Sequence, residues 1–188
     1  MTSTSGGRLR ALRSPRVALI IAITVTAAVA LTVIGMTVGS GASTTHDLGQ
    51  AKNFTLSVLG HPSQHLSLKS MAGRPVIVNF FASWCGPCQK ETPLIAQFYR
   101  ARQAHVTVVG IDVNDSSAAA LSFIHKSGVT YPVAVDPLPM KTATAYGLPG
   151  LPATFFLNAQ HRIVKRVFGA VTQAELTSGA TLMKQRDR

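Results

Sequence analysis

Residues 76–88 read VIVNFFASWCGPC, and the two cysteines of this stretch are the only ones in the chain. The run Val76–Phe81 is apolar on both faces, which is typical of a central strand covered on each side. Residues 89–104 have helical character. The stretch therefore predicts a strand that leads into a helix, with a pair of thiols, Cys85 and Cys88, at the junction.

The position of the two thiols predicts disulfide exchange. A cysteine at the start of a helix lies at the positive end of the helix dipole, where unpaired backbone N–H groups stabilise a thiolate. Pro87 falls in the first turn, where its missing N–H costs little. We therefore expect Cys85 to be the exposed nucleophile and Cys88 to be a buried cysteine that resolves the mixed disulfide.

Other roles for the cysteine pair fit the sequence less well. A structural disulfide across so short a loop would constrain the unfolded chain little. Zinc would need two more ligands, and the six histidines show no ligand spacing. Attachment of c-type haem would need a histidine where Gln89 stands. Peroxide-reducing enzymes on a related fold usually carry threonine where this chain has Ala82. We therefore expect a redox-active disulfide with no metal and no cofactor.

The rest of the pattern alternates short strands and helices. Strands are predicted at residues 54–59, 65–68, 76–81, 106–113, 131–136, 151–158 and 162–168, and helices at 89–104, 116–126, 140–146 and 172–184. Pro93 should kink the first of these helices. Thr172 should cap the last one, with Glu175 completing a capping box. Together they predict an α/β fold, a three-layer sandwich with a central mixed sheet.

The N-terminal part of the sequence predicts a membrane anchor. Val17–Val38 is uncharged over 22 residues and as a helix would span about 33 Å, enough for a hydrocarbon core of ~30 Å. Four arginines precede it, which places that side in the cytoplasm. We expect a basic cytoplasmic tail at 1–16, a single transmembrane helix at 17–38, a linker at 39–50 and an extracytoplasmic domain at 51–188.

A cleaved signal peptide is the alternative interpretation of this segment. Small residues at 39–43 could form a cleavage site, and the domain would then be secreted, although signal peptides usually have apolar regions of only about 7–15 residues. A lipid-anchored lipoprotein is excluded, because no cysteine lies near the end of the apolar run.

Charge adds one constraint on partners. The formal net charge is +11, from 18 Lys and Arg against 7 Asp and Glu. This balance suits a domain near an anionic membrane surface or one that meets acidic partners. No stripe of Lys and Arg is interleaved with aromatic residues, so no nucleic-acid partner is expected.

The motif and its surroundings resemble a known family. Residues 78–88, then Glu91 and Pro93, then the LPATF sequence at 151–155, are similar to the membrane-tethered TlpA/ResA-like thioredoxins. The resemblance covers about residues 48–185. It implies a thioredoxin fold with a family insert at about residues 112–140.

The resemblance also implies roles for three residues around the thiols. Pro152 should follow a cis peptide bond, a minority state for proline, and should pack beside the disulfide. Leu151 should offer backbone groups to an extended substrate segment. Trp84 should flank the site as an apolar substrate contact, although simple packing is the alternative.

One carboxylate distinguishes this chain from cytoplasmic thioredoxins. Those proteins keep a buried aspartate six residues before the first cysteine, where this chain has Asn79, which cannot accept a proton. ResA-like members instead carry a glutamate three residues after the second cysteine, which here is Glu91. We expect Glu91 to be an acid/base for Cys88, with a raised pKa. The alternative is a surface glutamate that stabilises the first helical turn.

The sequence therefore predicts an extracytoplasmic thiol–disulfide oxidoreductase that reduces disulfides of exported proteins. By analogy with the family, apocytochrome c is an expected substrate and a transmembrane electron carrier an expected donor. The first alternative is an oxidase that donates disulfides to exported proteins. The second, from a different class, is a binding module or chaperone without redox activity.

Overall fold

The computed structural model describes residues 48–102 and 106–184. The predicted cytoplasmic tail and membrane anchor at 1–38 lie outside these residues. Among the residues that are described, no helix is both long and apolar enough to cross a bilayer.

Seven strands and a small set of helices alternate along the described chain. In order they are β1 (Thr55–Val58), β2 (His61–Ser67), the 3₁₀ helix η1 (Leu68–Met71), β3 (Val76–Phe81), α2 (Gly86–Arg102), β4 (Thr107–Val113), α3 (Ser117–Lys126), β5 (Val133–Asp136), α4 (Lys141–Ala145), β6 (Ala153–Leu157), β7 (Ile163–Phe168) and α5 (Gln173–Met183).

The strands form one mixed sheet in the order β2-β1-β5-β4-β3-β6-β7. Strand β3 lies inside it, parallel to β4 and antiparallel to β6. Strands β4 and β5 are parallel, and the pairs β1–β2, β1–β5 and β6–β7 are antiparallel. The prediction of a central mixed sheet is confirmed. Strands β2 and β7 are its outer strands, and residues 49–51 pair with the start of β7, where the Ile163 N–H donates to the Gly49 carbonyl at 2.9 Å.

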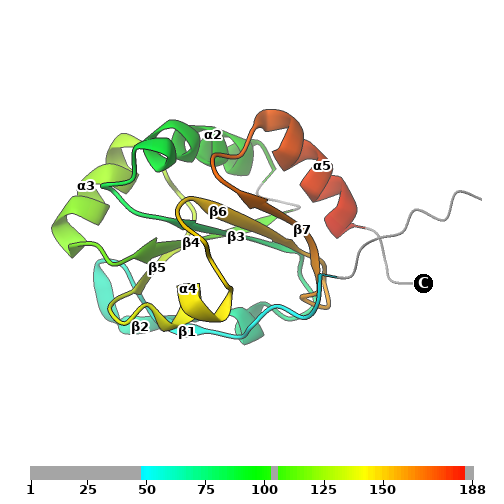
Figure 1. Ribbon diagram of the computed structural model, residues 1–188, viewed down its shortest axis with the longest axis horizontal. Helices are drawn as coiled ribbons and strands as arrows, with labels where there is room; N and C mark the ends of the chain where they lie inside the picture. Colours follow the sequence, from blue (N-terminus) through cyan, green and yellow to red (C-terminus); the bar gives the residue numbers. More distant parts are fainter. Residues whose placement is uncertain (1–47, 103–105, 185–188) are drawn as a thin grey trace, which may run out of the picture. The chain divides into compact units, whose positions relative to one another are not determined.

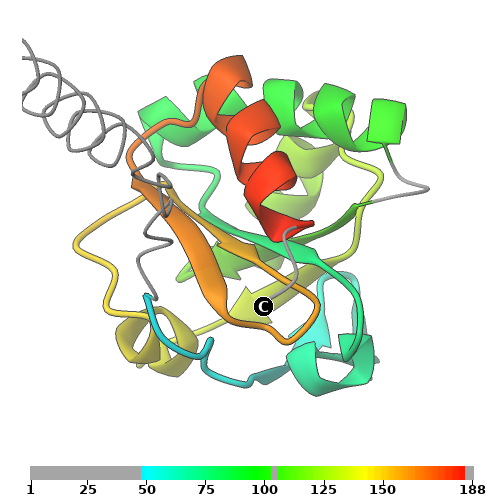
Figure 2. The same ribbon diagram turned by 90° about the vertical axis from the view of Figure 1, so that its right-hand side faces the viewer.

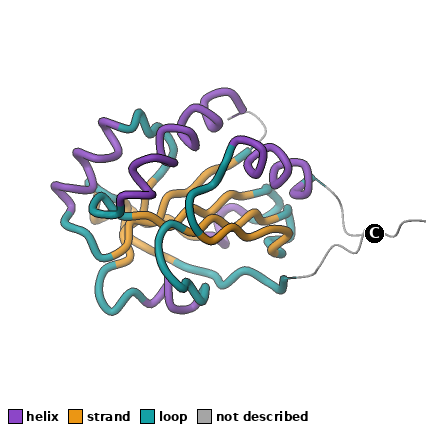
Figure 3. Tube along the Cα trace, turned by 45° about the horizontal axis from the view of Figure 1, so that its top comes forward, coloured by secondary structure: helices purple, strands orange, loops and turns teal. Residues whose placement is uncertain are grey.

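The helices cover the two faces of the sheet unequally. Helices α2, α3 and α5 lie over one face and the short helix α4 lies over the other (Figures 1 and 3). In β3, Ile77 and Phe81 face the core beneath α2, α3 and α5, whereas Val76, Val78 and Phe80 face the opposite core. Both faces of β3 are therefore buried, which explains why its sequence is apolar without alternation.

Helix α5 approaches the sheet closely at a glycine. It lies across β6 and β7 (Figure 2). A Cβ atom added at Gly179 would overlap the ring of Phe156 on β6. Glycine at this position is therefore required by packing rather than by backbone conformation.

Side chains cap the N-termini of α3 and α5. Ser116 caps α3 by accepting a hydrogen bond from the Ala119 N–H. Thr172 Oγ1 accepts from the Glu175 N–H at 3.2 Å, and Glu175 Oε2 accepts from the Thr172 N–H at 2.8 Å. The predicted capping box at the start of α5 is thus confirmed.

Some boundaries differ from the prediction. Helix α2 begins at Gly86 and includes Cys88 in its first turn, whereas residues 89–104 were predicted. The hairpin partner of β1 is seven residues long rather than four, and η1 follows it unpredicted. Pro93 lies inside α2, and the kink expected there stays a prediction.

Candidate active site

The two cysteines form a disulfide where β3 gives way to α2. Cys85 follows the strand by four residues, and Cys88 lies in the first turn of α2. The Cys85 N–H donates to the Ala82 carbonyl at 3.2 Å, closing a turn between the strand and the helix. The Cys88 N–H points to Cys85 Sγ at 3.2 Å. In the reduced protein this N–H and the helix N-terminus would favour a thiolate at Cys85.

The two sulfur-bearing residues differ in accessibility less than was predicted. Cys88 is fully buried, as expected, and Cys85 is only 5% exposed. The prediction of an exposed Cys85 is therefore wrong for the disulfide state, because the bond ties its Sγ to Cys88 within the first helical turn. Cys85 is still the more accessible of the two.

Glu91 lies on α2 one turn beyond Cys88 and is 2% exposed. It is not the surface residue of the alternative interpretation. Its Oε1 accepts a hydrogen bond from Asn79 Nδ2 at 2.8 Å, and its Oε2 accepts from the Val171 N–H at 2.6 Å. Burial raises the pKa of Glu91 to about 7, outweighing the two hydrogen bonds that lower it, and the charge of Glu175 raises it further.

Asn79 connects Glu91 to the strand β6. Its Nδ2 also donates to Thr154 Oγ1 at 3.0 Å, and the two residues are register partners in the β3–β6 pair. Asn79 Oδ1 is buried and has no hydrogen-bond partner in the described part of the chain. Thr154 could have been inferred from its place in the LPATF sequence, whereas no sequence signal points to the Val171 amide.

Pro152 follows a cis peptide bond, as predicted. It directly precedes β6, whose first residue, Ala153, pairs with Phe80 of β3. Pro152 therefore lies at the same end of the sheet as the cysteine turn, and its carbonyl accepts from the Gly169 N–H at 2.9 Å. A second cis bond, Leu138–Pro139, was not predicted.

Trp84, which directly precedes Cys85, and Leu151 line one open pocket. The pocket has a volume of about 470 Å³, and its walls are mostly apolar. The other lining residues are Val113, Asn114, Met140, Ala143, Thr144, Leu148, Pro149 and Gly150. Trp84 is 60% exposed, and its indole Nε1–H donates to the Asn114 carbonyl at 3.1 Å. Leu151 also packs against the core cluster that contains both cysteines.

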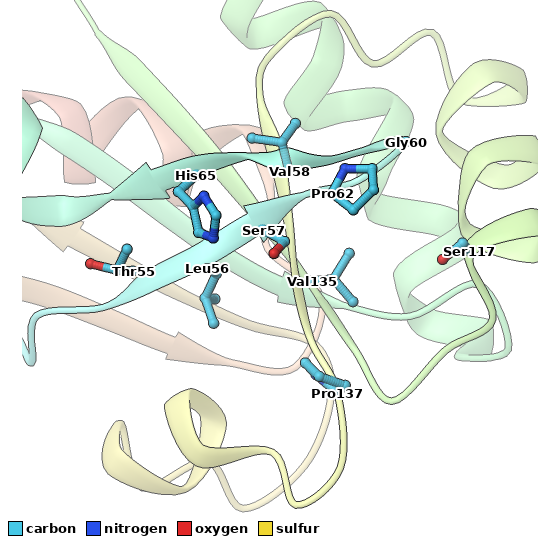
Figure 4. Close-up of a pocket in the computed structure, with 10 residues that line it drawn as sticks. All are labelled: Thr55, Leu56, Ser57, Val58, Gly60, Pro62, His65, Ser117, Val135 and Pro137. Atoms are coloured by element: carbon cyan, nitrogen blue, oxygen red, sulfur yellow. The ribbon is translucent and has the colours of Figure 1, made fainter.

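A larger cavity, of about 620 Å³, lies away from the thiols between β1, β2, β5 and the start of α3. Figure 4 shows its lining, in which His65 and Pro62 come from β2, Val135 comes from β5, and Pro137 directly follows β5. None of the predicted site residues borders this cavity. Two of the predicted site residues, Trp84 and Leu151, line the smaller pocket instead.

No metal centre is evident in the part of the chain that the structure covers. Within residues 48–102 and 106–184, no three His, Cys, Asp or Glu side chains are grouped so as to hold an ion.

Comparison with known proteins agrees with this site. The model of the AhpC/TSA family matches residues 49–166. The thiol-disulfide oxidoreductase ResA of Bacillus subtilis is 32% identical over 135 residues, which cover 71% of this chain and 74% of ResA. The chain belongs to the AhpC/TSA family of thioredoxin-like proteins and, within it, groups with the ResA-type thiol–disulfide oxidoreductases.

Solved structures give the same class. A secreted thiol-disulfide isomerase from Corynebacterium glutamicum aligns with a TM-score of 0.66 and 28% identity, covering 72% of this chain and 86% of that one. A DsbF homologue from Corynebacterium diphtheriae aligns with a TM-score of 0.63 and 28% identity, covering 71% and 85%. The protein is a thiol–disulfide oxidoreductase with a thioredoxin-like fold.

Proposed function

We propose that the protein reduces disulfides of exported proteins on the outer side of a membrane, with Cys85 as nucleophile and Cys88 as resolving thiol. The observation that carries this proposal is the buried Glu91, whose pKa of about 7 suits it to exchange a proton beside Cys88. The placement outside the cytoplasm rests on the apolar segment Val17–Val38 and the four arginines before it.

The exchange proceeds in two balanced steps. The Cys85 thiolate attacks one sulfur of the substrate disulfide, forming a mixed disulfide and releasing the other substrate sulfur as a thiolate, which takes up a proton. Cys88 then gives its proton to Glu91 and attacks Cys85 Sγ. This breaks the bond between Cys85 Sγ and the substrate sulfur, which leaves as a thiolate and takes up a proton. The substrate leaves with both sulfurs reduced, and the enzyme is left with the Cys85–Cys88 disulfide seen in the structure.

The pocket that Trp84 lines suggests how a substrate is held. Trp84 and Leu151 both belong to its mostly apolar walls. An extended segment with small or apolar side chains next to its cysteines would bury these walls, while the backbone of Leu151 offers hydrogen bonds. We propose Trp84, Leu151 and Pro152 as the substrate-binding residues.

Apocytochrome c is the substrate that we propose by analogy with ResA-like thioredoxins. Its haem-binding cysteine pair would be reduced before haem attachment. A transmembrane electron carrier would then return two electrons to the Cys85–Cys88 disulfide. No cofactor other than the thiols is needed for either step.

The direction of electron flow is tested by the reduction potential of the cysteine pair. We expect equilibration of the full-length protein with glutathione buffers to give a value near −270 mV, about that of thioredoxin. A value near −120 mV, about that of DsbA, would instead make the protein an oxidase that donates disulfides.

An insulin-reduction assay distinguishes a redox enzyme from a binding module without redox activity. We expect turnover with dithiothreitol as donor and its loss in Cys85→Ser. Equal turnover in wild type and Cys85→Ser, or none in either, would favour the binding module.

A further inference from the structure

Charged side chains are distributed unequally between the two ends of the sheet. The acidic side chains of the described residues all lie at the end that carries the disulfide, and they are Glu91, Asp112, Asp115, Asp136 and Glu175. Strands β4 and β5 are parallel to β3, so the acids at their carboxyl ends lie at the end where the cysteine turn follows β3. The bond from the Val171 N–H to Glu91 holds the start of α5, with Glu175, at this end as well. Glu91 and Asp112 are buried here, and Glu175 is exposed.

Three segments of the chain meet at the opposite end of the sheet. The Ala51 N–H donates to the His161 carbonyl at 3.0 Å, and the Gly73 N–H donates to the Ala159 carbonyl at 3.1 Å. These bonds tie the turn between β6 and β7 to the segments on either side of β1 and β2. Because β6 is antiparallel to β3 and ends in this turn, the three segments lie away from the disulfide.

The three segments carry positive charge and no negative charge. Residues 48–75 and 157–163 contain no Asp or Glu. Their cationic side chains are Lys52, Lys69, Arg74 and Arg162, of which the first three are exposed and the last is half-buried. Helix α2 starts at the disulfide and runs toward the same end, with Arg100 and Arg102 in its last turn. We call the surface formed by these six side chains the cationic end.

The chain enters the domain at the cationic end. The Ile163 N–H donates to the Gly49 carbonyl at 2.9 Å, and Gln50 pairs with Arg162. The apolar segment Val17–Val38 precedes these residues in the sequence. In the anchored protein that we propose, the chain that comes from the membrane therefore reaches the domain at its most cationic surface.

We propose that the cationic end binds the anionic headgroups of phospholipids, so that the disulfide end faces away from the bilayer. Lys and Arg side chains close to a bilayer are attracted by its negative surface charge, over a Debye length of about 8 Å at physiological salt. The acids at the other end are not attracted to the same surface. The role of this contact rests on the proposed membrane placement, whereas the separation of charge is a property of the domain itself.

Sedimentation with lipid vesicles tests this binding. The fragment from residue 45 is used, because residues 45–188 form a compact unit of their own and an apolar segment long enough to span a bilayer would bind vesicles by itself. We expect the fragment to bind phosphatidylcholine vesicles that contain phosphatidylglycerol and not to bind vesicles of pure phosphatidylcholine. Binding should be lost at 1 M salt, where the Debye length falls to about 3 Å. Absence of binding to the anionic vesicles at low salt would overturn the proposal.

Charge reversal at each end of the sheet gives matched variants. Lys69→Glu with Arg74→Glu changes two exposed cations of the cationic end. Each Lys or Arg near an anionic surface raises binding about fivefold, so this double variant should bind the anionic vesicles at least about tenfold more weakly. Lys90→Glu with Lys141→Glu changes two exposed cations at the disulfide end and should weaken binding much less. An equal loss in both double variants would assign binding to net charge alone and overturn the proposal.

Trp84 reports which end of the domain faces the lipid. It is the only tryptophan of the chain, directly precedes Cys85, and is 60% exposed. Its fluorescence should stay unchanged when the fragment binds anionic vesicles that carry a nitroxide quencher on their headgroups. Quenching of Trp84 on binding would place the disulfide end on the membrane and refute the proposed orientation.

The insulin-reduction assay separates this proposal from the proposed function. Lys69→Glu with Arg74→Glu should reduce insulin as fast as the wild-type fragment, because both residues lie away from the disulfide, and this activity also shows that the variant is folded. A wild-type fragment that reduces insulin but does not bind the anionic vesicles would refute the proposal and leave the oxidoreductase function in place. Binding to soluble poly-glutamate without binding to vesicles would assign the cationic end to an acidic protein partner and would also refute the proposal.

Discussion

Asn79 and Glu91 form a buried hydrogen-bonded pair, with Glu91 three residues beyond Cys88 on α2. Asn79 cannot accept a proton, but its Nδ2 donates to Glu91 Oε1 and so favours the ionised carboxylate. Burial favours the neutral acid more strongly, and the resulting pKa is about 7. A group with this value gains and loses protons readily at neutral pH, which is what a proton shuttle for Cys88 needs.

Removing the carboxyl of Glu91 should slow disulfide exchange. We expect Glu91→Gln to lower the exchange rate on the order of 10²-fold, because a general acid/base typically contributes at least this much. The pH–rate profile should also lose its inflection near pH 7. Stopped-flow reduction of a model disulfide between pH 5 and 9 measures both quantities. An unchanged rate and profile would remove Glu91 from the mechanism.

Asn79→Ala supplies the complementary test at the same contact. This change deletes a hydrogen bond that lowers the pKa of Glu91 while leaving the carboxyl in place. The inflection should therefore move to higher pH rather than disappear. A shift to lower pH would contradict the assignment of the inflection to Glu91.

At the scale of single residues, the sequence predicted which residues form the site better than it predicted the contacts around them. The resemblance to the TlpA/ResA-like thioredoxins indicated Glu91 and Pro152, and the structure buries Glu91 and places a cis peptide bond before Pro152. The Val171 amide that bonds Glu91 comes from a loop 80 residues away in sequence, and no local pattern indicates it. Asp112 was missed because a single acid at the end of an apolar strand does not reveal whether its neighbours bury it.

At the scale of elements, the contact of α5 with β6 is unusually tight. Gly179 lets the helix backbone rest on the Phe156 ring, and neighbouring Leu176 and Ala180 complete the contact beneath α5. The same helix begins two residues after Val171, whose amide bonds Glu91. The seating of α5 therefore affects the stability of the domain and the position of a bond to Glu91.

Gly179→Ala should destabilise the domain although alanine is the better helix former. The added methyl group cannot be accommodated without moving Phe156, and overpacking of this kind costs about 1–3 kcal/mol, more than the ~1 kcal/mol gained in helix propensity. Urea unfolding of the fragment from residue 45 measures the difference. Ser178→Ala, at an exposed neighbouring position of α5, is the control and should change stability by less. Equal or greater stability of Gly179→Ala would show that α5 is not closely seated.

Elements with strong local signals were predicted well, and those without them were not. The apolar run of residues 76–81 predicted β3, and the Thr172–Glu175 capping box predicted the start of α5, each to within a residue or two. Strand β2 was predicted too short, because its sequence HPSQHLS is polar and contains proline, as suits an edge strand rather than a core strand. Its extent is determined by pairing with β1, which is a tertiary effect.

At the scale of the whole domain, the two buried carboxyls make stability depend on pH. Glu91 and Asp112 each have a pKa of about 7 in the folded protein, above their ordinary values of 4.5 and 3.8. The folded state therefore binds more protons than the unfolded state between about pH 4 and 7. Their contribution to stability is full below the ordinary values and is lost as pH rises through 7.

We therefore expect the oxidised fragment from residue 45 to be less stable at pH 8 than at pH 5. Each carboxyl should contribute about 2 kcal/mol to the difference, since one unit of pKa shift corresponds to about 1.4 kcal/mol. Urea denaturation at the two pH values, followed by circular dichroism, measures it. In the double variant Glu91→Gln, Asp112→Asn, most of the dependence of stability on pH should be lost. If the stability of the wild-type fragment were the same at both pH values, the pKa of neither carboxyl would be raised as described.

The two outer strands of the sheet limit how another polypeptide can attach, and the start of β7 is already paired with residues 49–51. On β2, Pro62 lacks the N–H that an added strand would need. On β7, Lys165 is drawn toward α5 by its bond to Ser178 Oγ at 2.8 Å, and Arg166 stacks over the Phe168 ring at 5.5 Å. Cationic side chains along an edge disfavour lateral association. These features therefore disfavour the addition of an unfolded substrate chain as a strand at either edge of the sheet. Contact at the end of the sheet that carries Cys85 and Cys88 is favoured instead.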